Sequence, residues 1–67
     1  MNVNEYRAAV ARSGLRNIDI ADSLGITPAA LWAKAKGKRE FRVSEVKKLK
    51  NLLDLTWKEV NTIFFDV

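Results

Sequence analysis

The sequence contains no cysteine and no histidine, and it has only one proline and three glycines among its 67 residues. Without cysteine there is no disulfide, no thiolate metal site and no cysteine nucleophile, and without histidine the commonest general acid or base is missing. The serines therefore have no imidazole to activate them, and the isolated glycines form no phosphate-binding loop. We expect a protein that is not an enzyme and that needs no cofactor and no metal.

Long apolar runs are also missing from the sequence. No stretch approaches the ~20 residues that a membrane-spanning helix requires, and nothing typical of a signal peptide opens the chain. We therefore expect no membrane association and a cytoplasmic location. Hydrophobic residues still make up 48% of the chain, which is enough to fill a core and argues against disorder. A chain this short forms one domain, spanning residues 1–67, that buries about 60% of its unfolded surface.

Positive charge is concentrated in one part of the chain. The sequence holds 12 basic and 8 acidic residues, for a net charge of +4. The segment from Lys34 to Lys50 holds eight basic residues and only two acidic ones, Glu40 and Glu45, for a net charge of +6. The rest of the chain therefore has a net charge of −2. A basic cluster on such a body is typical of a protein that binds a polyanion. Basic residues on helix surfaces also keep proteins soluble, so charge alone leaves both interpretations open.

Helical spacing and helix-end residues predict five short helices, and the sequence has almost no strand propensity outside the C-terminus. The predicted elements are a helix capped by Asn2 and ended by Ser13-Gly14, a helix from about Asn17 to Leu24, a helix from Thr27-Pro28 to about Lys36, a helix capped by Ser44, and a helix opened by the capping box Thr56-Trp57-Lys58-Glu59. The predicted inner faces of the first, second, fourth and fifth helices are, in this order, Tyr6, Ala9, Val10 and Leu15; Ile20, Ala21 and Leu24; Val46, Leu49, Leu52 and Leu53; and Val60, Ile63 and Phe64. Phe41 is expected to anchor the loop 37–40 to the core. We expect an all-α fold, a compact bundle of about five helices.

The most informative segment runs from residue 17 to residue 37. Ala21 is small at the point where two helices would cross closely, and Gly25 follows four residues later, where a tight turn needs a positive φ angle. Apolar residues at 20, 24, 26 and 31 would fill the wedge between the two helices. This combination predicts a helix-turn-helix, in which the second helix enters the DNA major groove.

These residues resemble a known family. Ile20-Ala21-Asp22-Ser23-Leu24-Gly25-Ile26-Thr27, followed by Gly37-Lys38-Arg39-Glu40-Phe41 and Ser44-Glu45-Val46, is similar to the phage lambda repressor and Cro-like (XRE-type) helix-turn-helix proteins, over nearly the whole chain. The second stretch resembles the small phage Cro-like subset, where a lysine also occupies the place of Lys34. The resemblance implies a lambda repressor-like DNA-binding domain that binds double-stranded operator DNA as a homodimer and regulates transcription in a bacterial host.

The resemblance also implies roles for particular residues. The positions that would look onto the DNA bases are Thr27, Pro28, Ala29, Trp32 and Ala33. The positions that would meet the phosphates are Asn17, Lys34, Lys36, Lys38 and Arg39. The base-facing set lacks the Arg, Gln, Ser or Asn that often distinguish bases in this family, and alanine methyl groups can only pack against thymine methyl groups. Specificity then depends on thymine contacts and DNA shape, or it is low.

Several of these residues have a second interpretation. Trp32 either contacts DNA or, as we favour, folds back over the fourth helix as peripheral core. Lys34 and Lys36 either contact phosphates or complement the helix dipole. The carboxylates Glu40 and Glu45 are expected to be solvent-exposed on helix surfaces. Candidate dimer contacts are Trp57, Phe64 and Phe65. One helical face cannot bury both adjacent phenylalanines, so we place the second at a subunit interface.

Two other functions remain open alongside a DNA-binding regulator. The apolar surface of Pro28, Ala29, Trp32 and Ala33 also suits a helical protein-interaction module, an antirepressor or co-regulator that binds a partner repressor protein. A nonspecific architectural DNA-binding protein would have the same basic charge but no preference among sequences. An enzyme is the class that we least expect.

Overall fold

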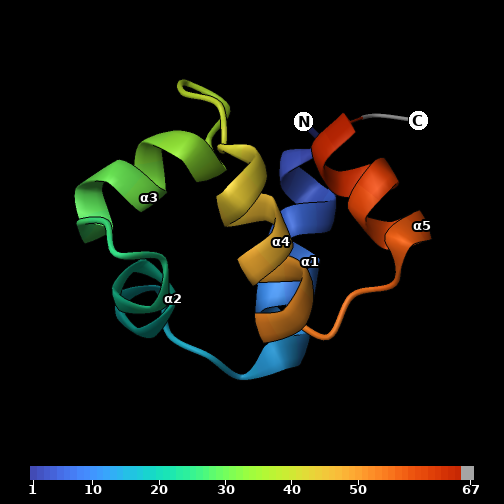
Figure 1. Ribbon diagram of the computed structural model, residues 1–67, viewed down its shortest axis with the longest axis horizontal. Helices are drawn as coiled ribbons and strands as arrows, with labels where there is room; N and C mark the ends of the chain where they lie inside the picture. Colours follow the sequence, from blue (N-terminus) through green and yellow to red (C-terminus); the bar gives the residue numbers. More distant parts are fainter. Residues whose placement is uncertain (66–67) are drawn as a thin grey trace.

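The computed structural model describes residues 1–65, which fold into five helices without any strand. The helices are α1 (Val3–Ser13), α2 (Asn17–Leu24), α3 (Pro28–Ala35), α4 (Val43–Leu52) and α5 (Trp57–Val60), and α5 continues as the π-helical turn η1 (Asn61–Phe65) (Figure 1). The predicted all-α class is confirmed for these residues. None of their helices is long and apolar enough to cross a membrane. The Asp66-Val67 end, whose pairing as a strand between subunits the sequence leaves open, lies outside the described residues.

Local side chains begin three of the helices as predicted. The Asn2 side chain accepts a hydrogen bond from the backbone N–H three residues further on, at 3.1 Å. Thr27 does the same at the start of α3, also at 3.1 Å, with proline in the first turn. Thr56 and Glu59 form the predicted capping box, each side chain accepting the backbone N–H of the other, at 3.1 and 2.9 Å. These helix starts are therefore determined by residues next to them in the sequence.

The predicted start of the fourth helix is wrong. The helix begins at Val43 with Arg42 as its N-cap, whereas Ser44 is an exposed residue of the first turn. The reason is the Glu45 side chain, which accepts the backbone N–H of Arg42 at 2.8 Å. A carboxylate at this third helical position satisfies the N–H of the N-cap residue, as in a capping box, and so favours a helix that begins directly after Arg42. The helix consequently begins two residues earlier than the serine cap predicts.

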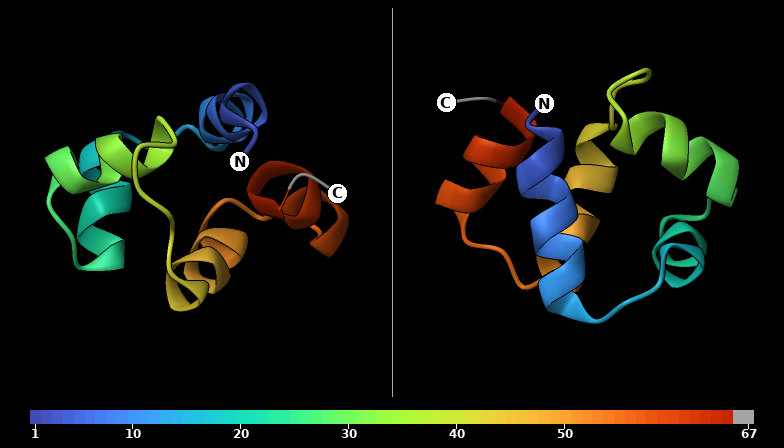
Figure 2. Two further views of the ribbon diagram at one scale, coloured as in Figure 1. Left: turned by 90° about the horizontal axis from the view of Figure 1, so that it is seen from above. Right: turned by 180° about the vertical axis from the view of Figure 1, so that it is seen from behind.

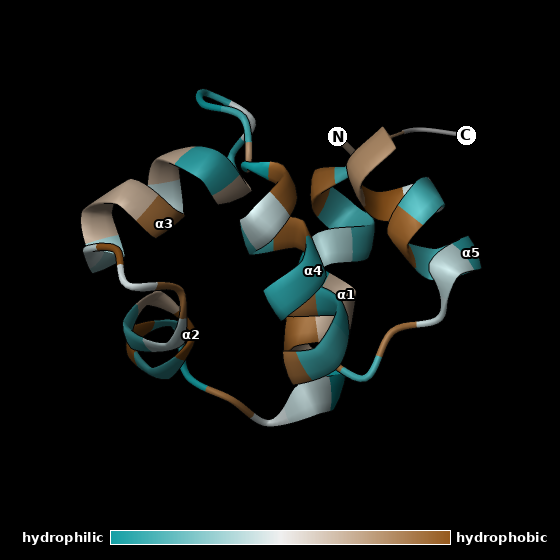
Figure 3. Ribbon diagram, in the orientation of Figure 1, coloured by the Kyte–Doolittle hydropathy of each residue, from teal (hydrophilic) through white to brown (hydrophobic). Residues whose placement is uncertain are grey.

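The core lies where the faces of the five helices meet. α2 packs against α3 and α4, while α1 packs against α3 and η1. In Figure 3, hydrophobic and hydrophilic segments alternate along α4 and α5, as expected for helices with one apolar face. The buried core residues are Tyr6, Ala9, Ile20, Ala21, Leu24, Leu31, Val46, Leu49, Leu53, Leu55, Val60 and Ile63. The predicted inner residues Val10, Leu15, Leu52 and Phe64 are only partly buried, packed against the edge of this core.

An aromatic triad joins the beginning and the end of the described chain. The rings of Tyr6, Phe41 and Phe64 lie 5.5 to 6.3 Å apart between centroids, in tilted and edge-to-face arrangements. Beside them, the backbone N–H of Asn2 donates to the carbonyl oxygen of Ile63 at 2.7 Å. The N-terminus consequently lies next to η1 (Figure 2). Phe41 anchors the loop after α3, as the sequence predicts.

A three-residue turn, residues 25–27, sets α3 across α2. Gly25 has a φ of +70°, which a residue with a Cβ adopts only with strain. The backbone N–H of Ile26 donates to the carbonyl oxygen of Ala21 at 3.0 Å and closes the end of α2. In Figure 1, α2 is seen nearly along its axis whereas α3 lies across the view. The turn therefore places α3 along one edge of the molecule.

Candidate nucleic-acid interface

The outer face of α3 is a surface of small and aromatic side chains. Thr27, Pro28, Ala29 and Trp32 are exposed, and Ala33 at the edge of this face is half-buried. The opposite side of the helix enters the core through Leu31. At 100° per residue, positions 28, 29, 32 and 36 fall on the same side. All five residues expected to look onto the bases thus lie on or beside one solvent-facing surface, which we call the α3 face.

Trp32 and Lys36 form one unit on the α3 face. The Trp32 side chain is 56% exposed, so the expectation that it folds back over the fourth helix is wrong. Instead, the Lys36 ammonium lies 3.4 Å from the centroid of the indole ring, one helical turn further along. A cation over an aromatic face is attracted by the ring quadrupole. The pair therefore presents both an apolar ring and a positive charge to the solvent.

Lys34 does not belong to this surface. Its side chain is buried, and its Nζ lies 2.7 Å from each carboxylate oxygen of Glu45. The predicted phosphate contact of Lys34 is therefore wrong, because position 34 lies on the side of α3 that faces the start of α4. The expectation that Glu45 is a surface carboxylate is wrong for the same reason.

The ion pair keeps Glu45 charged. Burial alone raises the pKa of this carboxyl group, but the hydrogen bonds from the Lys34 ammonium and the Arg42 N–H outweigh burial and hold the pKa below its ordinary value. The carboxylate thus cancels the charge of Lys34 and at the same time caps α4. The pair is a structural link between the end of α3 and the start of α4.

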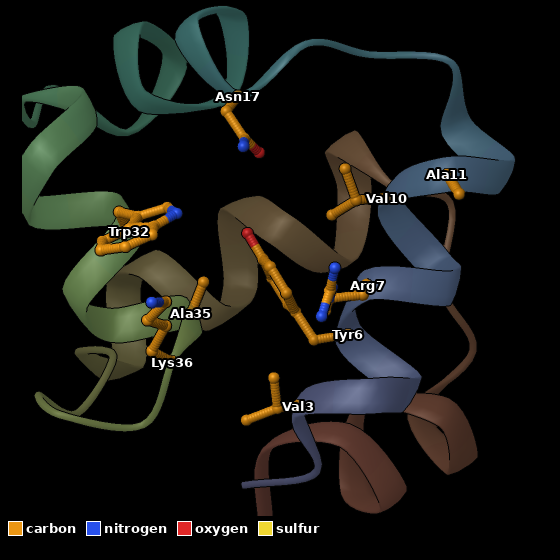
Figure 4. Close-up of a pocket in the computed structure, with 9 residues that line it drawn as sticks. All are labelled: Val3, Tyr6, Arg7, Val10, Ala11, Asn17, Trp32, Ala35 and Lys36. Atoms are coloured by element: carbon orange, nitrogen blue, oxygen red, sulfur yellow. The ribbon is translucent and has the colours of Figure 1, made fainter.

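One flank of the α3 face is a cavity of about 530 Å³ between α1 and α3, which we call the α1–α3 cavity (Figure 4). Asn17 from the start of α2, Arg7 from α1 and Lys36 line it together. Asn17 and Lys36 are predicted site residues that the fold brings to the wall of the same cavity. Arg7 is not among the residues of this surface that the sequence predicts. The pattern that could have indicated it is helical spacing, since positions 3, 7, 10 and 11 of α1 lie on one side of the helix and all line this cavity.

The other flank is formed by residues 37–42 of the loop between α3 and α4. Gly37, with a φ of +83°, ends α3, and the backbone N–H of Lys38 donates to the carbonyl oxygen of Ala33 at 3.0 Å. The loop projects from the molecule beyond the end of α3 (Figure 1), and both Lys38 and Arg39 are exposed in it. Arg39 also lines a smaller cavity of about 330 Å³ together with Arg42, Lys48 and the turn after α2. Cations therefore border α3 on this side too.

The candidate dimer residues lie at the opposite end of the molecule. Trp57 is 60% exposed, with the Lys50 ammonium 4.8 Å from the centroid of its ring, and Phe65 is also exposed. Phe64 is half-buried in the aromatic triad. Of the two adjacent phenylalanines, only Phe65 is therefore turned outward. α5 and α3 occupy opposite sides of Figure 1, so a contact between subunits at α5 would leave α3 uncovered.

Two other acidic side chains, Asp19 and Glu59, have structural partners. Asp19 pairs with Arg16 at 3.0 Å, and this hydrogen bond holds the pKa of Asp19 below its ordinary value. Glu59 accepts the N–H of Thr56 and lies 3.4 Å from Arg12; the hydrogen bond from Thr56 is the main reason why the pKa of Glu59 is lowered. Within residues 1–65, no group of three or more acidic, histidine or cysteine side chains could hold a metal ion.

Comparisons of the chain with protein-family models, with curated proteins and with solved structures find no match. Function is therefore inferred from the exposure, charge and geometry of α3 and of the elements on its two flanks.

Proposed function

We propose that the protein is a sequence-specific DNA-binding transcription regulator of the phage Cro or repressor type, acting in the cytoplasm of a bacterial host. In this proposal α2 and α3 form a helix-turn-helix, and α3 enters the major groove. The single observation that carries the proposal is an exposed α3 face with cations on both sides. Arg7 and Lys36 lie on one flank, and Lys38 and Arg39 lie on the other.

The size and chemistry of α3 support insertion into the major groove. A helix with its side chains is about 10–12 Å across, which matches the major groove width of about 12 Å, and the small residues of α3 keep it at the slender end of this range. The small side chains of Ala29 and Ala33 allow a close approach, and their methyl groups suit thymine methyl groups. The Thr27 hydroxyl already accepts a backbone hydrogen bond, so it meets a base as a donor. Recognition in this proposal depends on thymine methyl groups and DNA shape more than on bidentate hydrogen bonds.

The phosphate-binding set in this proposal differs from the one that the sequence predicts. The proposed set excludes Lys34, because Glu45 cancels its charge, and includes Arg7 of α1. The set becomes Arg7, Asn17, Lys36, Lys38 and Arg39. Side chains on the two flanks would meet the two phosphate backbones that border one major groove, which fixes the register of α3 without reading the sequence.

A homodimer completes the proposal. The described chain measures 28 × 24 × 20 Å and offers one α3 face, so a single copy contacts one half-site. Two copies joined through Trp57 and Phe65 would keep both α3 helices free to contact half-sites about 34–36 Å apart.

Selection of binding sites from a random DNA pool tests the proposal most directly. We expect enrichment of a two-fold symmetric sequence whose half-sites are centred about 10–10.5 base pairs apart. An electrophoretic shift with the selected site, in the presence of nonspecific competitor DNA, then measures specificity. Binding without any enriched sequence would indicate a nonspecific architectural protein. The absence of DNA binding at low salt would exclude both the sequence-specific regulator and the architectural protein.

A protein-interaction module is the second candidate function. The observation that favours it is the apolar α3 face, where Pro28, Ala29 and Trp32 offer no side-chain amide or guanidinium to a base. The partner would be a repressor protein, with this chain acting as its antirepressor or co-regulator. A DNA shift that appears or disappears only when that second protein is added would favour this alternative over direct recognition.

A further inference from the structure

The hydroxyl group of Tyr6 is buried without a partner. The residue is 2% exposed, and its hydroxyl oxygen has no hydrogen bond among the described residues. The ring is held in place between Phe41 and Phe64, which prevents the side chain from turning its hydroxyl toward solvent. In Figure 4 the hydroxyl points into the α1–α3 cavity, toward Asn17 and Trp32. Buried hydroxyl groups nearly always have a partner, so this one requires an explanation.

The proton of the Tyr6 hydroxyl group has no acceptor among the described residues. Burial raises the pKa of Tyr6 to about 12, so the phenol keeps its proton at neutral pH and can donate it in a hydrogen bond. Lys36 and Arg7, which line the same cavity, carry only donors. These cations could donate to the lone pairs of the hydroxyl oxygen but cannot accept its proton, and the amide of Asn17 in the same cavity makes no hydrogen bond to it. A group that supplies an acceptor oxygen would take that proton.

The α1–α3 cavity has the size and the lining of a small-molecule site. Its volume of about 530 Å³ falls within the range of about 300–1,000 Å³ that is typical of ligand pockets. Val3, Val10, Ala35 and the Trp32 ring provide apolar walls. Arg7 and Lys36 add positive charge, and no aspartate or glutamate is among the described residues that line the cavity. Such a site favours an anion attached to an apolar body.

We propose that the α1–α3 cavity binds a small organic carboxylate with a compact apolar body. The carboxylate accepts the Tyr6 hydroxyl hydrogen bond in the field of Arg7 and Lys36. The apolar body packs against Val10 and the Trp32 ring. Because the hydroxyl oxygen itself is buried, the carboxylate reaches it only after side chains of the cavity wall shift.

Occupancy of this cavity would regulate the α3 face. Trp32 and Lys36 belong to the cavity wall and to that face, so a carboxylate that pairs with Lys36 withdraws its charge from DNA. This consequence rests on the proposed function, and it predicts that the carboxylate lowers DNA affinity. By thermodynamic reciprocity, DNA then lowers the affinity for the carboxylate by the same factor.

A titration of the free protein, without DNA, tests the site. Benzoate is the probe, and benzamide is the neutral control of nearly the same shape. The Trp57→Phe variant leaves Trp32 as the sole tryptophan, so that its fluorescence reports on the cavity. We expect saturable binding of benzoate and affinity for benzamide that is weaker by about tenfold or more. Equal responses to the two compounds, or no saturable response to benzoate, would overturn the proposal.

Three variants determine which side chains bind the probe. Tyr6→Phe should weaken benzoate binding by about tenfold while leaving the fold as stable as the parent, or more stable, because an unpartnered hydroxyl is removed. Arg7→Gln should also weaken binding, whereas Lys47→Gln, an exposed cation outside the cavity, should not. The proposal fails if Tyr6→Phe binds benzoate as the parent does, or if it is less stable than the parent. It also fails if Lys47→Gln weakens binding as much as Arg7→Gln.

A DNA shift with the selected operator, in increasing benzoate, tests the regulatory consequence. We expect DNA affinity to fall as the cavity fills, and we expect Tyr6→Phe to need about tenfold more benzoate for the same fall. Unchanged DNA affinity at saturating benzoate would refute regulation. If the protein binds no DNA, the proposed function fails, and the titration of the free protein still decides whether the cavity binds a carboxylate.

Discussion

Lys34 and Glu45 are eleven residues apart in the sequence and form a buried ion pair. The sequence places Lys34 in a basic run at the end of a predicted recognition helix, and that context favours a phosphate contact. Its spacing of three residues from Leu31 indicates the inner side of α3 instead. The spacing alone cannot show that a carboxylate lies opposite, because that depends on how α4 packs. The predictions for Lys34 and Glu45 are therefore wrong for one reason, which is a contact between residues far apart in the sequence.

Glu45→Gln isolates the charge of this pair. The amide oxygen still accepts the Arg42 N–H, so the cap of α4 is kept, but the Lys34 ammonium loses its counter-charge in a buried position. We expect the free energy of unfolding to fall by about 3 kcal/mol, as when one member of a buried ion pair is removed. Urea denaturation measures the loss, with the exposed Glu40→Gln as the matched control. Equal stability of the two variants would contradict the assigned role of the pair.

Stability should also depend on the protonation of Glu45. The folded-state pKa of this carboxyl group is below its ordinary value of 4.5, so the unfolded state takes up the proton first as the pH falls. The stabilisation is therefore fully present above that ordinary value and is lost as the pH falls through the folded-state pKa. Unfolding free energies measured from pH 7 downward should decline in this range, and more shallowly in Glu45→Gln. Identical pH profiles for the parent and the variant would show that the pair does not contribute.

At the scale of the elements, local sequence predicts most of the helix ends. The Asn2 and Thr27 caps and the Thr56–Glu59 capping box all depend on neighbours within three residues, and these predictions are confirmed. The start of α4 is the exception, since the side chain that caps it comes from inside the helix and is held by a residue of α3. Helix ends that depend on tertiary contacts are the ones that a local pattern misplaces.

The turn between α4 and α5 contains a strained residue that the sequence does not single out. Asp54 has a φ of +54°, in the left-handed region that favours glycine. Asp54→Gly should raise the free energy of unfolding by about 0.5–1 kcal/mol, because glycine adopts this conformation without a steric penalty. Asp54→Val should lower it, since a β-branched residue resists positive φ. Thermal unfolding of both variants shows whether each one is more or less stable than the parent. A glycine variant that is less stable than the parent would contradict the strain at Asp54.

Lys36→Ala tests the role of α3 in the proposed function. A phosphate contact is independent of sequence, so DNA affinity should fall on every DNA tested by a similar factor, and the salt dependence should become shallower by about one unit of slope. Lys58→Ala, an exposed cation on α5, is the control and should bind as the parent does. A loss confined to one operator would mean that Lys36 contacts a base.

For the whole molecule, composition predicts the class of fold but only the approximate position of the charge. Helical spacing and a 48% apolar content are sufficient for an all-α bundle. The count of cations between residues 34 and 50 does not reveal that one of them is neutralised by Glu45, nor that Arg7 of α1 joins the α3 face across the α1–α3 cavity. Both depend on which helices pack together. The family resemblance and the roles that it implies remain predictions.

The salt dependence of DNA binding tests the summed charge of the proposed interface. Four cations, Arg7, Lys36, Lys38 and Arg39, would neutralise about four phosphates per monomer. The logarithm of the binding constant should then fall against the logarithm of the salt concentration with a slope of about −4 per monomer. Equilibrium binding at several salt concentrations measures this slope. A slope near zero would show that the phosphates are not contacted.

The bond between Asn2 and Ile63 closes the described chain into a ring beside the aromatic triad. Fraying of either end would therefore uncover Tyr6 and Phe64 together, which makes the two extremities one cooperative unit in unfolding. Slow hydrogen exchange is consequently expected at the Asn2 amide, a position that in most small domains exchanges freely. Trimming the first two residues would loosen η1 at the far end of the sequence.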